Sequence, residues 1–475
     1  MLNIQLYFAA VGYTFESGMR ILLTHGYFLA LDEREQQIMR PYLPLGLLYI
    51  SAWLNKHNVA HDVLDTTFMQ PDAQWDYINT IKPDVIALYV NLMTRKHIVS
   101  IMQRIRSDAN LSETCIILGG PEVRNHAEQF LHYGANYLVV GEGEESFLEL
   151  IQHLQKNQPT HHLKGIAQLD ASGNVLITGE REKMRNLDDL PIPNRGAVDL
   201  QHYLDVWKKH HGKNAISVST MRGCPYTCTW CSRAVYGQSY RRRSPEKVIE
   251  ELLDIRTRYA PDTIWFVDDV FTISHKWLST FADLMEKHQV GIPFECITRA
   301  DRMSEEVIRH LHRAGCFRVW IGAESGSQRI IDAMDRRVEV EQVQEMIRLT
   351  RAQGIEAGTF IMLGYPGEEE ADIHATVQHL IAAQPDYFTI TTAYPIKGTG
   401  LYTAVEPAIT QAPDWSISSD RDIQFRRTYP ENYYPHAVRY VVHAVQYTKT
   451  HKWTHLLKAR IALLGMQWVR LTHAK

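Results

Sequence analysis

The sequence predicts an α/β protein in which two successive series of strands and helices build two parallel sheets. Short β-branched segments alternate with amphipathic helical patterns over 19–150, and a second alternating series runs over 215–400. Alternation with short connections is typical of parallel sheets covered by helices. We therefore expect a doubly wound first domain followed by a partial (β/α)6 barrel. Residues 401–475 lack this alternation and predict a mainly helical C-terminal region.

Apolar segments place five strands in the first series and six in the second. Parallel sheets bind ligands beyond the carboxyl ends of their strands, so functional residues are expected directly after these segments. The expected strands are Ile21–Thr24, His61–Leu64, Val85–Tyr89, Cys115–Leu118 and Tyr137–Val140, then Ile216–Thr220, Thr263–Val267, Phe294–Thr298, Phe317–Gly322, Ala357–Leu363 and Tyr387–Thr392.

Two segments stand outside the alternation. Residues 1–18 lack the basic start and cleavage site of a signal peptide, and we expect them to be an extension before a start at Met19. Residues 151–214 are more polar, and between Leu187 and Pro193 they carry an acidic pair followed by two prolines. Prolines in such a setting favour an extended chain, so 151–214 predicts a linker.

The composition is that of a globular protein, with 45% hydrophobic and 22% charged residues in a chain of 475. A length of this order allows two or three domains, each with its own core. The net charge of −4 gives no reason to expect nucleic acid as a partner. No run of eighteen apolar residues occurs, so we expect no membrane span and a cytoplasmic location.

The C-terminal tail has an unusual charge pattern. Residues 433–475 look helical and contain no acidic residue, and the segment from His455 to Arg470 mixes Lys and Arg with large apolar side chains. A basic amphipathic helix of this kind can make a peripheral contact with a membrane surface. The same pattern fits a terminal helix packed on the barrel, and the sequence leaves both interpretations open.

Three cysteines within eight positions carry the main chemical signal. Cys224, Cys228 and Cys231 have the spacing C-x3-C-x2-C and follow an expected strand. Three thiolates on one loop can hold three irons of a [4Fe–4S] cluster and leave the fourth iron open to another ligand. A structural zinc site would require a fourth Cys or His at a matching spacing, and isolated core cysteines rarely cluster in this way. The remaining cysteines, Cys115, Cys296 and Cys316, are expected to be core residues.

This cysteine motif, with Trp230 before its last member, resembles the signature of the radical S-adenosylmethionine (SAM) superfamily. The resemblance implies that SAM chelates the open iron through its amino and carboxylate groups. An electron from a donor such as flavodoxin or ferredoxin then splits SAM into methionine and a 5′-deoxyadenosyl radical. That radical abstracts hydrogen from the substrate, while the protein orients the cofactors and excludes water.

Motifs at the later strand ends extend the resemblance. The segments Trp265–Phe271, Thr298–Asp301, Gly322–Gly326 and Gly358–Glu368 resemble the family's SAM-pocket motifs on the second to fifth strands. Each is weak alone, and the acidic pair of the first could simply cap a helix. The resemblance implies contacts to SAM from Tyr226, Trp230, Asp268, Asp269, Arg299, Glu324 and Gly364.

The first domain resembles the cobalamin (B12)-binding domain that precedes the barrel in one radical SAM subclass. The resemblance rests on Arg40–Ser51, Leu118–Glu122 and Val140–Glu145. The motif Asp-x-His-x-x-Gly, which supplies a lower cobalt ligand in other cobalamin proteins, is absent from 1–150. A degenerate domain without cobalamin is the alternative. A lower-face residue would be sought first at Tyr89, Asn91 and Leu92, and cobalamin contacts are expected from Asn91, Gly119, Gly120, Pro121, Gly141 and Glu142.

Three functions follow from these resemblances. The first is a methyltransferase that delivers a methyl group from cobalamin to an unactivated carbon of a small or lipid-like substrate. The second is an oxidative cyclase or rearranging enzyme, similar to the anaerobic magnesium-protoporphyrin IX monomethyl ester cyclases. The third is a non-catalytic Fe–S protein, in which SAM-pocket motifs would have no role. The sequence identifies neither the substrate nor a catalytic residue beyond the cofactor sites.

Overall fold

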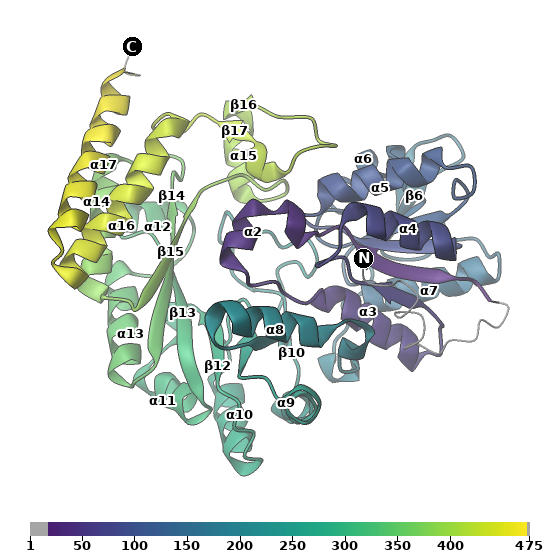
Figure 1. Cartoon of the computed structure of the whole chain (residues 1–475), viewed down its shortest axis with the longest axis horizontal. Coiled ribbons are helices and arrows are strands. Elements are labelled where there is room, and N and C mark those ends of the chain that lie inside the picture. The colour runs from purple at the N-terminus through teal and green to yellow at the C-terminus, as the bar shows by residue number, and fades with distance from the viewer. Residues whose placement is uncertain (1–17, 473–475) are drawn as a thin grey trace.

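The computed structural model describes residues 18–472 and contains two sheets side by side (Figure 1). The first sheet and its helices form one half of the molecule, drawn in purple and blue. The second sheet forms the other half in teal and green, and the yellow C-terminal helices pack on its outer side. The expected extension over 1–18 lies outside the described residues, apart from Gly18.

The first sheet has seven strands in the order β2-β1-β3-β4-β5-β6-β7. The first five in this order are parallel, and β6 and β7 add to the β5 edge in antiparallel pairs. The order 2-1-3-4-5 is that of flavodoxin-like doubly wound sheets, whose switch point between β1 and β3 is a ligand site. The strands are β1 (Ile21–His25), β2 (Asp62–Leu64), β3 (Val85–Tyr89), β4 (Cys115–Gly119), β5 (Tyr137–Val139), β6 (Ile166–Leu169) and β7 (Val175–Ile177).

Helices cover both faces of this sheet, as the doubly wound prediction requires. Alternate residues of each strand enter separate cores: Ile86 and Ile116 pack with the helices of one face, and Val85 and Ile117 with those of the other. The helices are α2 (Glu33–Ile38), α3 (Leu45–Lys56), α4 (Pro71–Ile81), α5 (Arg95–Ser107), α6 (Ala127–His132) and α7 (Gly143–Gln155), with a 3-10 turn at Leu29–Leu31.

Residues 151–214 differ from the extended linker that we expected. They begin with the end of α7, contribute β6 and β7 to the first sheet, and end in helix α8 (Leu200–His211). The strands β6 and β7 are only four and three residues long, which is too short for their sequence pattern to be recognised as strands. Only the part between β7 and α8 is irregular, with 3-10 turns at Leu187–Asp189 and Arg195–Ala197.

The second sheet has six parallel strands in the open order β15-β14-β13-β12-β11-β8, which gives the expected partial (β/α)6 barrel. A two-stranded ribbon, β9 (Met221–Arg222) with β10 (Arg241–Arg242), follows β8. The strands are β8 (Ala215–Val218), β11 (Thr263–Phe266), β12 (Phe294–Thr298), β13 (Cys316–Glu324), β14 (Glu356–Leu363) and β15 (Tyr387–Thr392); the helices are α9 (Pro245–Tyr259), α10 (His275–Lys287), α11 (Glu305–Arg313), α12 (Gln328–Ala333), α13 (Val340–Ala352) and α14 (Glu370–Ala383), with a 3-10 turn at Ala300–Arg302.

The C-terminal region begins with irregular chain and ends in two long antiparallel helices. None of the helices in residues 18–472 combines the length and the apolar composition that crossing a bilayer requires. The elements are α15 (Gly400–Val405), β16 (Ile409–Gln411), β17 (Gln424–Phe425), α16 (Tyr434–Thr450) and α17 (Trp453–Thr472), with 3-10 turns at Glu406–Ala408, Asp420–Asp422 and Glu431–Tyr433.

A buried carboxylate joins the segment before α8 to the barrel. Glu251 of α9 is fully buried and accepts hydrogen bonds from Arg195 at 2.6 Å and from Arg243. Arg195 also donates to the carbonyl of Ser217 in β8 at 3.0 Å. The two guanidinium groups depend on this one carboxylate, because charges buried this deeply are costly unless they are paired.

We expect Glu251→Ala to lower the stability of the barrel by about 3–5 kcal/mol, because it leaves two arginines buried beside a cavity. The measurement is the midpoint of thermal unfolding. The control is Glu250→Ala on the same helix, whose side chain is 56% exposed and pairs with Lys247. Loss of the Glu250 side chain should lower the free energy of unfolding by less than about 1 kcal/mol. Equal shifts in the unfolding midpoint for both variants would contradict the prediction.

Candidate active site

The three cysteines lie in the loop between β9 and β10, directly after the first barrel strand. Gly223 begins this loop with a φ of +84°. A Cβ at this position would lie 2.4 Å from the Ser239 hydroxyl and 2.5 Å from the Ser239 carbonyl oxygen. Only glycine combines such a close approach with a positive φ, so Gly223 fixes where the chain enters the cysteine loop, residues 223–240.

Asp268, at the end of the next strand β11, holds the start of this loop. Its buried carboxylate accepts from the backbone N–H of Thr220 at 2.7 Å and of Met221 at 3.1 Å, and from the Thr220 hydroxyl. Burial raises the pKa of Asp268, and Arg242, 3.6 Å away, opposes that shift. The predicted residue therefore has a positioning role in the described structure, and a contact to SAM stays a prediction.

The cysteine side chains converge, as the motif predicts. Cys228 is buried, Cys224 is half-buried and Cys231 is exposed. The pKa of the Cys228 thiol is lowered to about 5 by a hydrogen bond from Cys231 together with the nearby Arg336 and Arg299, although burial acts in the opposite direction. Since the thiolate is the form that binds metal, this cluster of sulfurs fits the expected iron–sulfur cluster. Of the other cysteines, Cys296 and Cys316 are buried in the barrel core and Cys115 is half-buried in β4, as expected.

Two buried arginines surround the Cys228 sulfur. Arg299 donates from Nη1 to Sγ at 3.5 Å and Arg336 from Nη1 at 3.8 Å. Arg299 also lies over the Tyr226 ring at 3.8 Å and donates to the Arg336 carbonyl at 2.6 Å. The sequence motifs identified Arg299 and Tyr226 but missed Arg336, because Arg336 follows helix α12 and belongs to none of them.

Glu324 and Trp230 line one cavity at the carboxyl ends of the barrel strands. The cavity lies over β14 and β15 and is completed by Phe360, Ile361, Met362, Thr389, Thr391, Tyr394 and Ile396. Glu324 has a φ of +67°, a strained value for a non-glycine residue, and its side chain lies 3.7 Å from Arg336. Burial raises its pKa and Arg336 opposes this. Backbone strain of this kind is concentrated at functional sites, so a polar contact from Glu324 to a ligand fits the geometry.

The last two residues predicted to contact SAM, Asp269 and Gly364, do not line the barrel cavity. Asp269 is exposed directly after Asp268. Gly364 ends β14 with a φ of +77°, its N–H donates to the buried Glu368 at 2.5 Å, and a Cβ would lie 3.0 Å from the Tyr434 ring. Gly364 therefore supports the strand end against the C-terminal helices, and its contact to SAM also stays a prediction.

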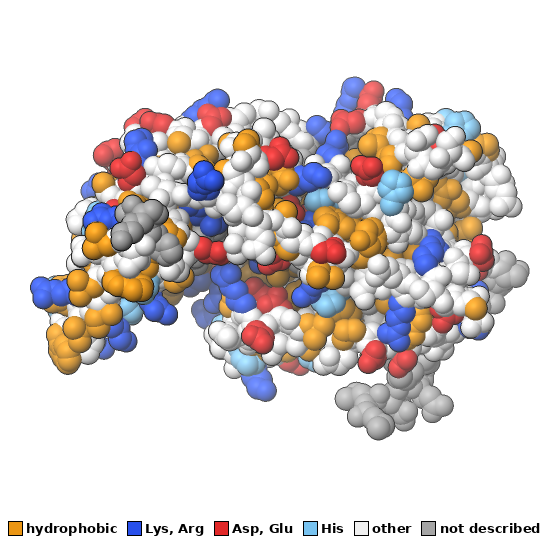
Figure 2. Space-filling view, turned by 90° about the horizontal axis from the view of Figure 1, so that it is seen from above, with side chains coloured by type: hydrophobic (Ala, Val, Ile, Leu, Met, Phe, Trp, Pro, Cys, Tyr) orange, Lys and Arg blue, Asp and Glu red, His pale blue; other side chains and the backbone are white. Residues whose placement is uncertain are grey.

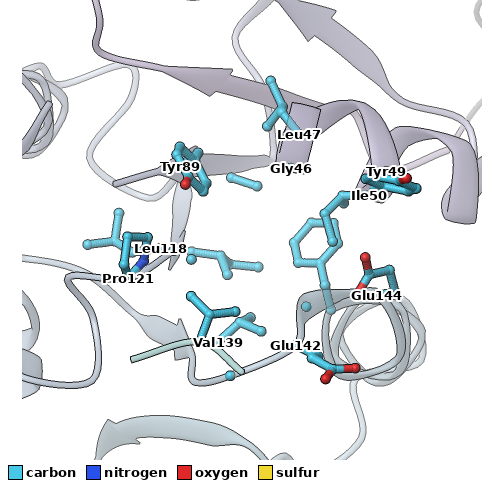
Figure 3. Close-up of a pocket in the computed structure, with 18 of the residues that line it drawn as sticks. Gly46, Leu47, Tyr49, Ile50, Tyr89, Leu118, Pro121, Val139, Glu142 and Glu144 are labelled. Carbon is cyan, nitrogen blue, oxygen red and sulfur yellow. The ribbon is translucent and has the colours of Figure 1, made fainter. Parts of the chain in front are cut away.

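A second cavity opens at the carboxyl edge of the first sheet (Figure 3). Its walls come from the ends of β3, β4 and β5, from α3 and from the start of α7, and they are mostly apolar. None of the described residues that line it is a histidine, which agrees with the missing Asp-x-His-x-x-Gly motif. Five predicted cobalamin residues line this cavity: Gly119, Gly120, Pro121, Gly141 and Glu142.

The glycines of β4 leave room for a large ligand. A Cβ on Gly119 would meet no atom within 4 Å, so the strand end faces open space. Gly120 has a φ of +118°, and its Cβ would lie 2.3 Å from the Val90 carbonyl oxygen. The apolar wall and the bare backbone fit a broad ligand such as a corrin, which supports cobalamin binding over a degenerate domain.

The three residues considered for the lower face of cobalt, Tyr89, Asn91 and Leu92, lie in different places in the structure. Tyr89 points into the cavity (Figure 3). The Asn91 side chain instead accepts from the backbone N–H of Met93 at 2.9 Å and of Thr94 at 3.1 Å, which holds the turn before α5. Leu92 lies at a different cavity, beside His97 and Ile417. Tyr89 is thus the one of the three that the structure brings to the expected site.

The cysteine loop also forms one wall of this second cavity. Val235 and Tyr236 of the loop line it, and so does Arg222, two residues before Cys224. Arg222 donates to Glu144 at 3.1 Å and lies 3.5 Å from Glu142. Sequence reasoning missed these residues, although the position of Arg222 beside the cysteine motif could have singled it out.

Four charged groups thus join the two domains beside the cavity. We call Glu142, Glu144, Arg222 and Arg241 the interdomain ion cluster; Arg241 of β10 pairs with Glu142, and all four side chains are largely buried. Two acidic and two basic groups balance one another, which offsets the cost of removing them from water.

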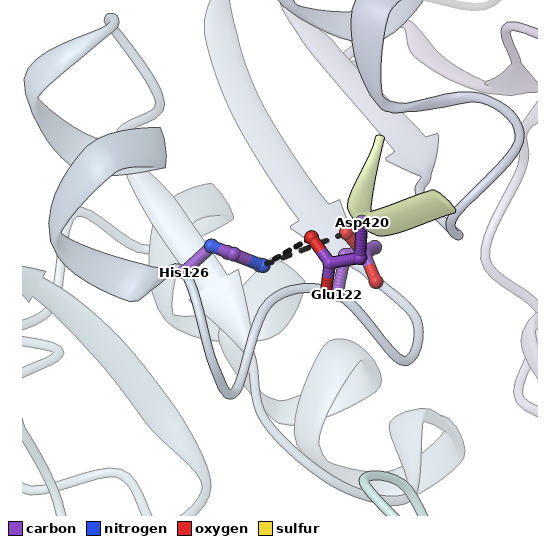
Figure 4. Close-up of side chains that lie close together, drawn as sticks. All are labelled: Glu122, His126 and Asp420. Atoms are coloured by element: carbon purple, nitrogen blue, oxygen red, sulfur yellow. Dashed lines mark ion pairs between the residues drawn. The ribbon is translucent and has the colours of Figure 1, made fainter. Parts of the chain in front are cut away.

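A third group of possible metal ligands lies between α6 and the C-terminal region. Glu122, His126 and Asp420 are buried close together (Figure 4). Arg95 donates to Glu122 and to Asp420 at 2.9 Å and lies 3.1 Å from His126. The guanidinium group supplies the positive charge that a metal ion would bring, so this group joins α5 and α6 to the C-terminal region rather than binding metal.

Two protein-family models match the chain in the order of its two sheets. The B12 binding domain matches residues 40–151, and the Radical SAM superfamily model matches residues 218–380. Fold and site together define a radical SAM enzyme with a preceding B12-binding domain. The chain therefore carries a B12-binding domain followed by a radical SAM domain, and these two domains imply a [4Fe–4S] cluster, SAM and cobalamin as cofactors. The expected resemblance is confirmed.

Individual proteins agree with this assignment. A Pyrococcus horikoshii protein named uncharacterized methyltransferase PH0819 is 28% identical over 370 residues, 76% of this chain and 77% of that protein. The anaerobic magnesium-protoporphyrin IX monomethyl ester cyclase of Rubrivivax gelatinosus is 24% identical over 387 residues, 78% of this chain and 66% of the cyclase.

A solved structure confirms the α/β architecture. OxsB, a cobalamin-dependent SAM radical enzyme with aqua-cobalamin and SAM bound, has a TM-score of 0.72 to this chain at 19% identity. The match covers 85% of this chain and 64% of OxsB, so the chain spans slightly less than two thirds of that protein. At this level of identity the likeness shows the fold.

We expect Cys228→Ala to prevent assembly of a four-iron cluster, because it removes one of the three thiolates on the loop. The measurement is iron, sulfide and visible absorbance after anaerobic reconstitution. Cys115→Ala, which changes a cysteine of the first sheet, is the control and should retain the cluster. A full cluster in Cys228→Ala would refute the ligand assignment.

We expect Gly119→Leu to weaken cobalamin binding at least about tenfold, because the added side chain fills space at the cavity wall. The measurement is cobalamin retained after reconstitution and gel filtration. Gly179→Leu adds the same side chain at an exposed glycine whose Cβ would also meet no atom within 4 Å. Equal retention by both variants would place cobalamin elsewhere.

Proposed function

We propose that the protein methylates an unactivated carbon of a small or lipid-like substrate. The observation that carries the proposal is the position of the cysteine loop between two cavities. Trp230 of the loop lines the barrel cavity, and Val235 and Tyr236 line the cavity of the B12-binding domain. A shared wall suits a reaction that uses both cofactors on one substrate. When bound, SAM at the cluster supplies a hydrogen-abstracting radical and methylated cobalamin supplies the methyl group.

The residues of the chain prepare the site for this chemistry. Arg299 and Arg336 stabilise negative charge on the Cys228 sulfur. Glu324 offers a carboxylate to the polar part of SAM from a wall that is otherwise mostly apolar. Apolar walls exclude water, which protects a reactive radical from side reactions. Exposed Cys231 leaves the loop accessible to an electron donor such as flavodoxin or ferredoxin.

An oxidative cyclase is the second candidate, because the Rubrivivax gelatinosus cyclase matches 78% of this chain. The two reactions differ in the fate of the methyl group of SAM. A methyltransferase passes this group through cobalamin to the product, whereas a cyclase forms a ring bond without it.

We expect the reconstituted protein to transfer label from methyl-labelled SAM to reduced cobalamin and, with a strong reductant, to form 5′-deoxyadenosine. The measurements are radioactivity in the cobalamin fraction and chromatography of the nucleoside. Gly119→Leu, which weakens cobalamin binding, should lose label transfer while still forming 5′-deoxyadenosine. Nucleoside formation without label in cobalamin would refute methyl transfer and favour the cyclase.

A further inference from the structure

Helix α17 has two apolar faces, and only one of them is packed. Its inner face buries Ala459, Ala462, Met466 and Val469, and α17 packs against α16. Large apolar side chains on its outer face are 47–71% exposed: Trp453, Leu457, Ile461, Leu464, Trp468 and Leu471. A helix that is apolar on opposite sides is normally covered on both, so the outer face has the composition of a contact surface.

The outer residues form one continuous stripe rather than scattered positions. Their spacings of three and four residues place them within a sector of about 80° around the helix axis. Figure 2 shows apolar side chains gathered along the left end of the molecule, with blue basic side chains beside them. Single exposed apolar residues are common on soluble proteins, but a contiguous row marks an interaction site.

The charge around this stripe identifies the kind of partner. Residues 432–475 contain seven Lys and Arg and no Asp or Glu. Lys458 and Arg460 are exposed on α17, at about 100° and 60° on opposite sides of the middle of the stripe. Trp453 and Trp468 add indole rings, which are favoured where an apolar region meets water.

We propose that α17 lies on an anionic lipid bilayer through this outer face, with Lys458 and Arg460 directed at lipid phosphates. Bilayer surfaces attract helices that combine a row of large apolar residues with a basic rim. A symmetric contact with a second copy of the chain is disfavoured, since it would bring two acid-free basic segments together. The helix lies along the surface, because none of the described helices can span the membrane.

Vesicle co-sedimentation of the full-length protein tests this surface. Vesicles of phosphatidylcholine alone are compared with vesicles that also contain phosphatidylglycerol. We expect wild type to bind the anionic vesicles at least about tenfold more tightly, and high salt to reduce this preference. Leu464→Ser combined with Trp468→Ser should reduce binding at least about tenfold, and Lys458→Ser combined with Arg460→Ser should remove the preference for anionic lipid.

The matched control is Ile177→Ser, which changes a 58% exposed apolar residue on β7 of the other domain and should leave binding unchanged. Circular dichroism and 5′-deoxyadenosine formation should be the same for all variants, because the changed residues are exposed and none of them lines either cofactor cavity. Absence of vesicle binding by wild type, or equal binding by the Leu464/Trp468 variant, would overturn the proposal. So would a wild-type dimer in analytical ultracentrifugation that this variant dissociates, since a second copy would then cover the face.

Discussion

The interdomain ion cluster of Glu142, Glu144, Arg222 and Arg241 fixes the relation between the two halves of the molecule. Its acidic members stand at the start of α7 in the B12-binding domain, and its basic members stand on the ribbon that brackets the cysteine loop. Removing one partner from such a buried group leaves an uncompensated charge, which costs several kcal/mol. Rotation of one domain against the other would separate all of these pairs at once.

This constraint explains why the cofactor sites act as one unit. The ribbon that carries Arg222 and Arg241 also begins and ends the loop of Cys224, Cys228 and Cys231. Val235 and Tyr236, from the same loop, form part of the cavity in the other domain. A displacement of the loop would therefore change the iron–sulfur site and the cobalamin cavity together. Enzymes that use two cofactors on one substrate need this kind of fixed geometry.

The sequence predicted the sheets and the cysteines because both signals are local. Strand periodicity and the C-x3-C-x2-C spacing are readable within short windows. The contacts that complete the site were out of reach, since Arg336 meets Cys228 across 108 residues and Asp268 meets Thr220 across 48. The strands β6 and β7 were missed because they are only four and three residues long, too short to give a clear strand pattern. Asn91 was predicted from its position after β3; its side-chain oxygen accepts from the local backbone, and its contact to cobalamin stays a prediction.

Helix α17 is another element whose contacts the sequence could not decide. Its basic, apolar sequence fits both a helix packed on the barrel and a helix on a membrane surface. The structure shows that packing accounts for one stripe only, with Met466 buried and Leu464 exposed two residues away. A single helix can satisfy both patterns, because 3.6 residues per turn separates two stripes on opposite faces. The inner stripe stabilises the fold, so the exposed one is free to meet a partner without unfolding any part of the domain.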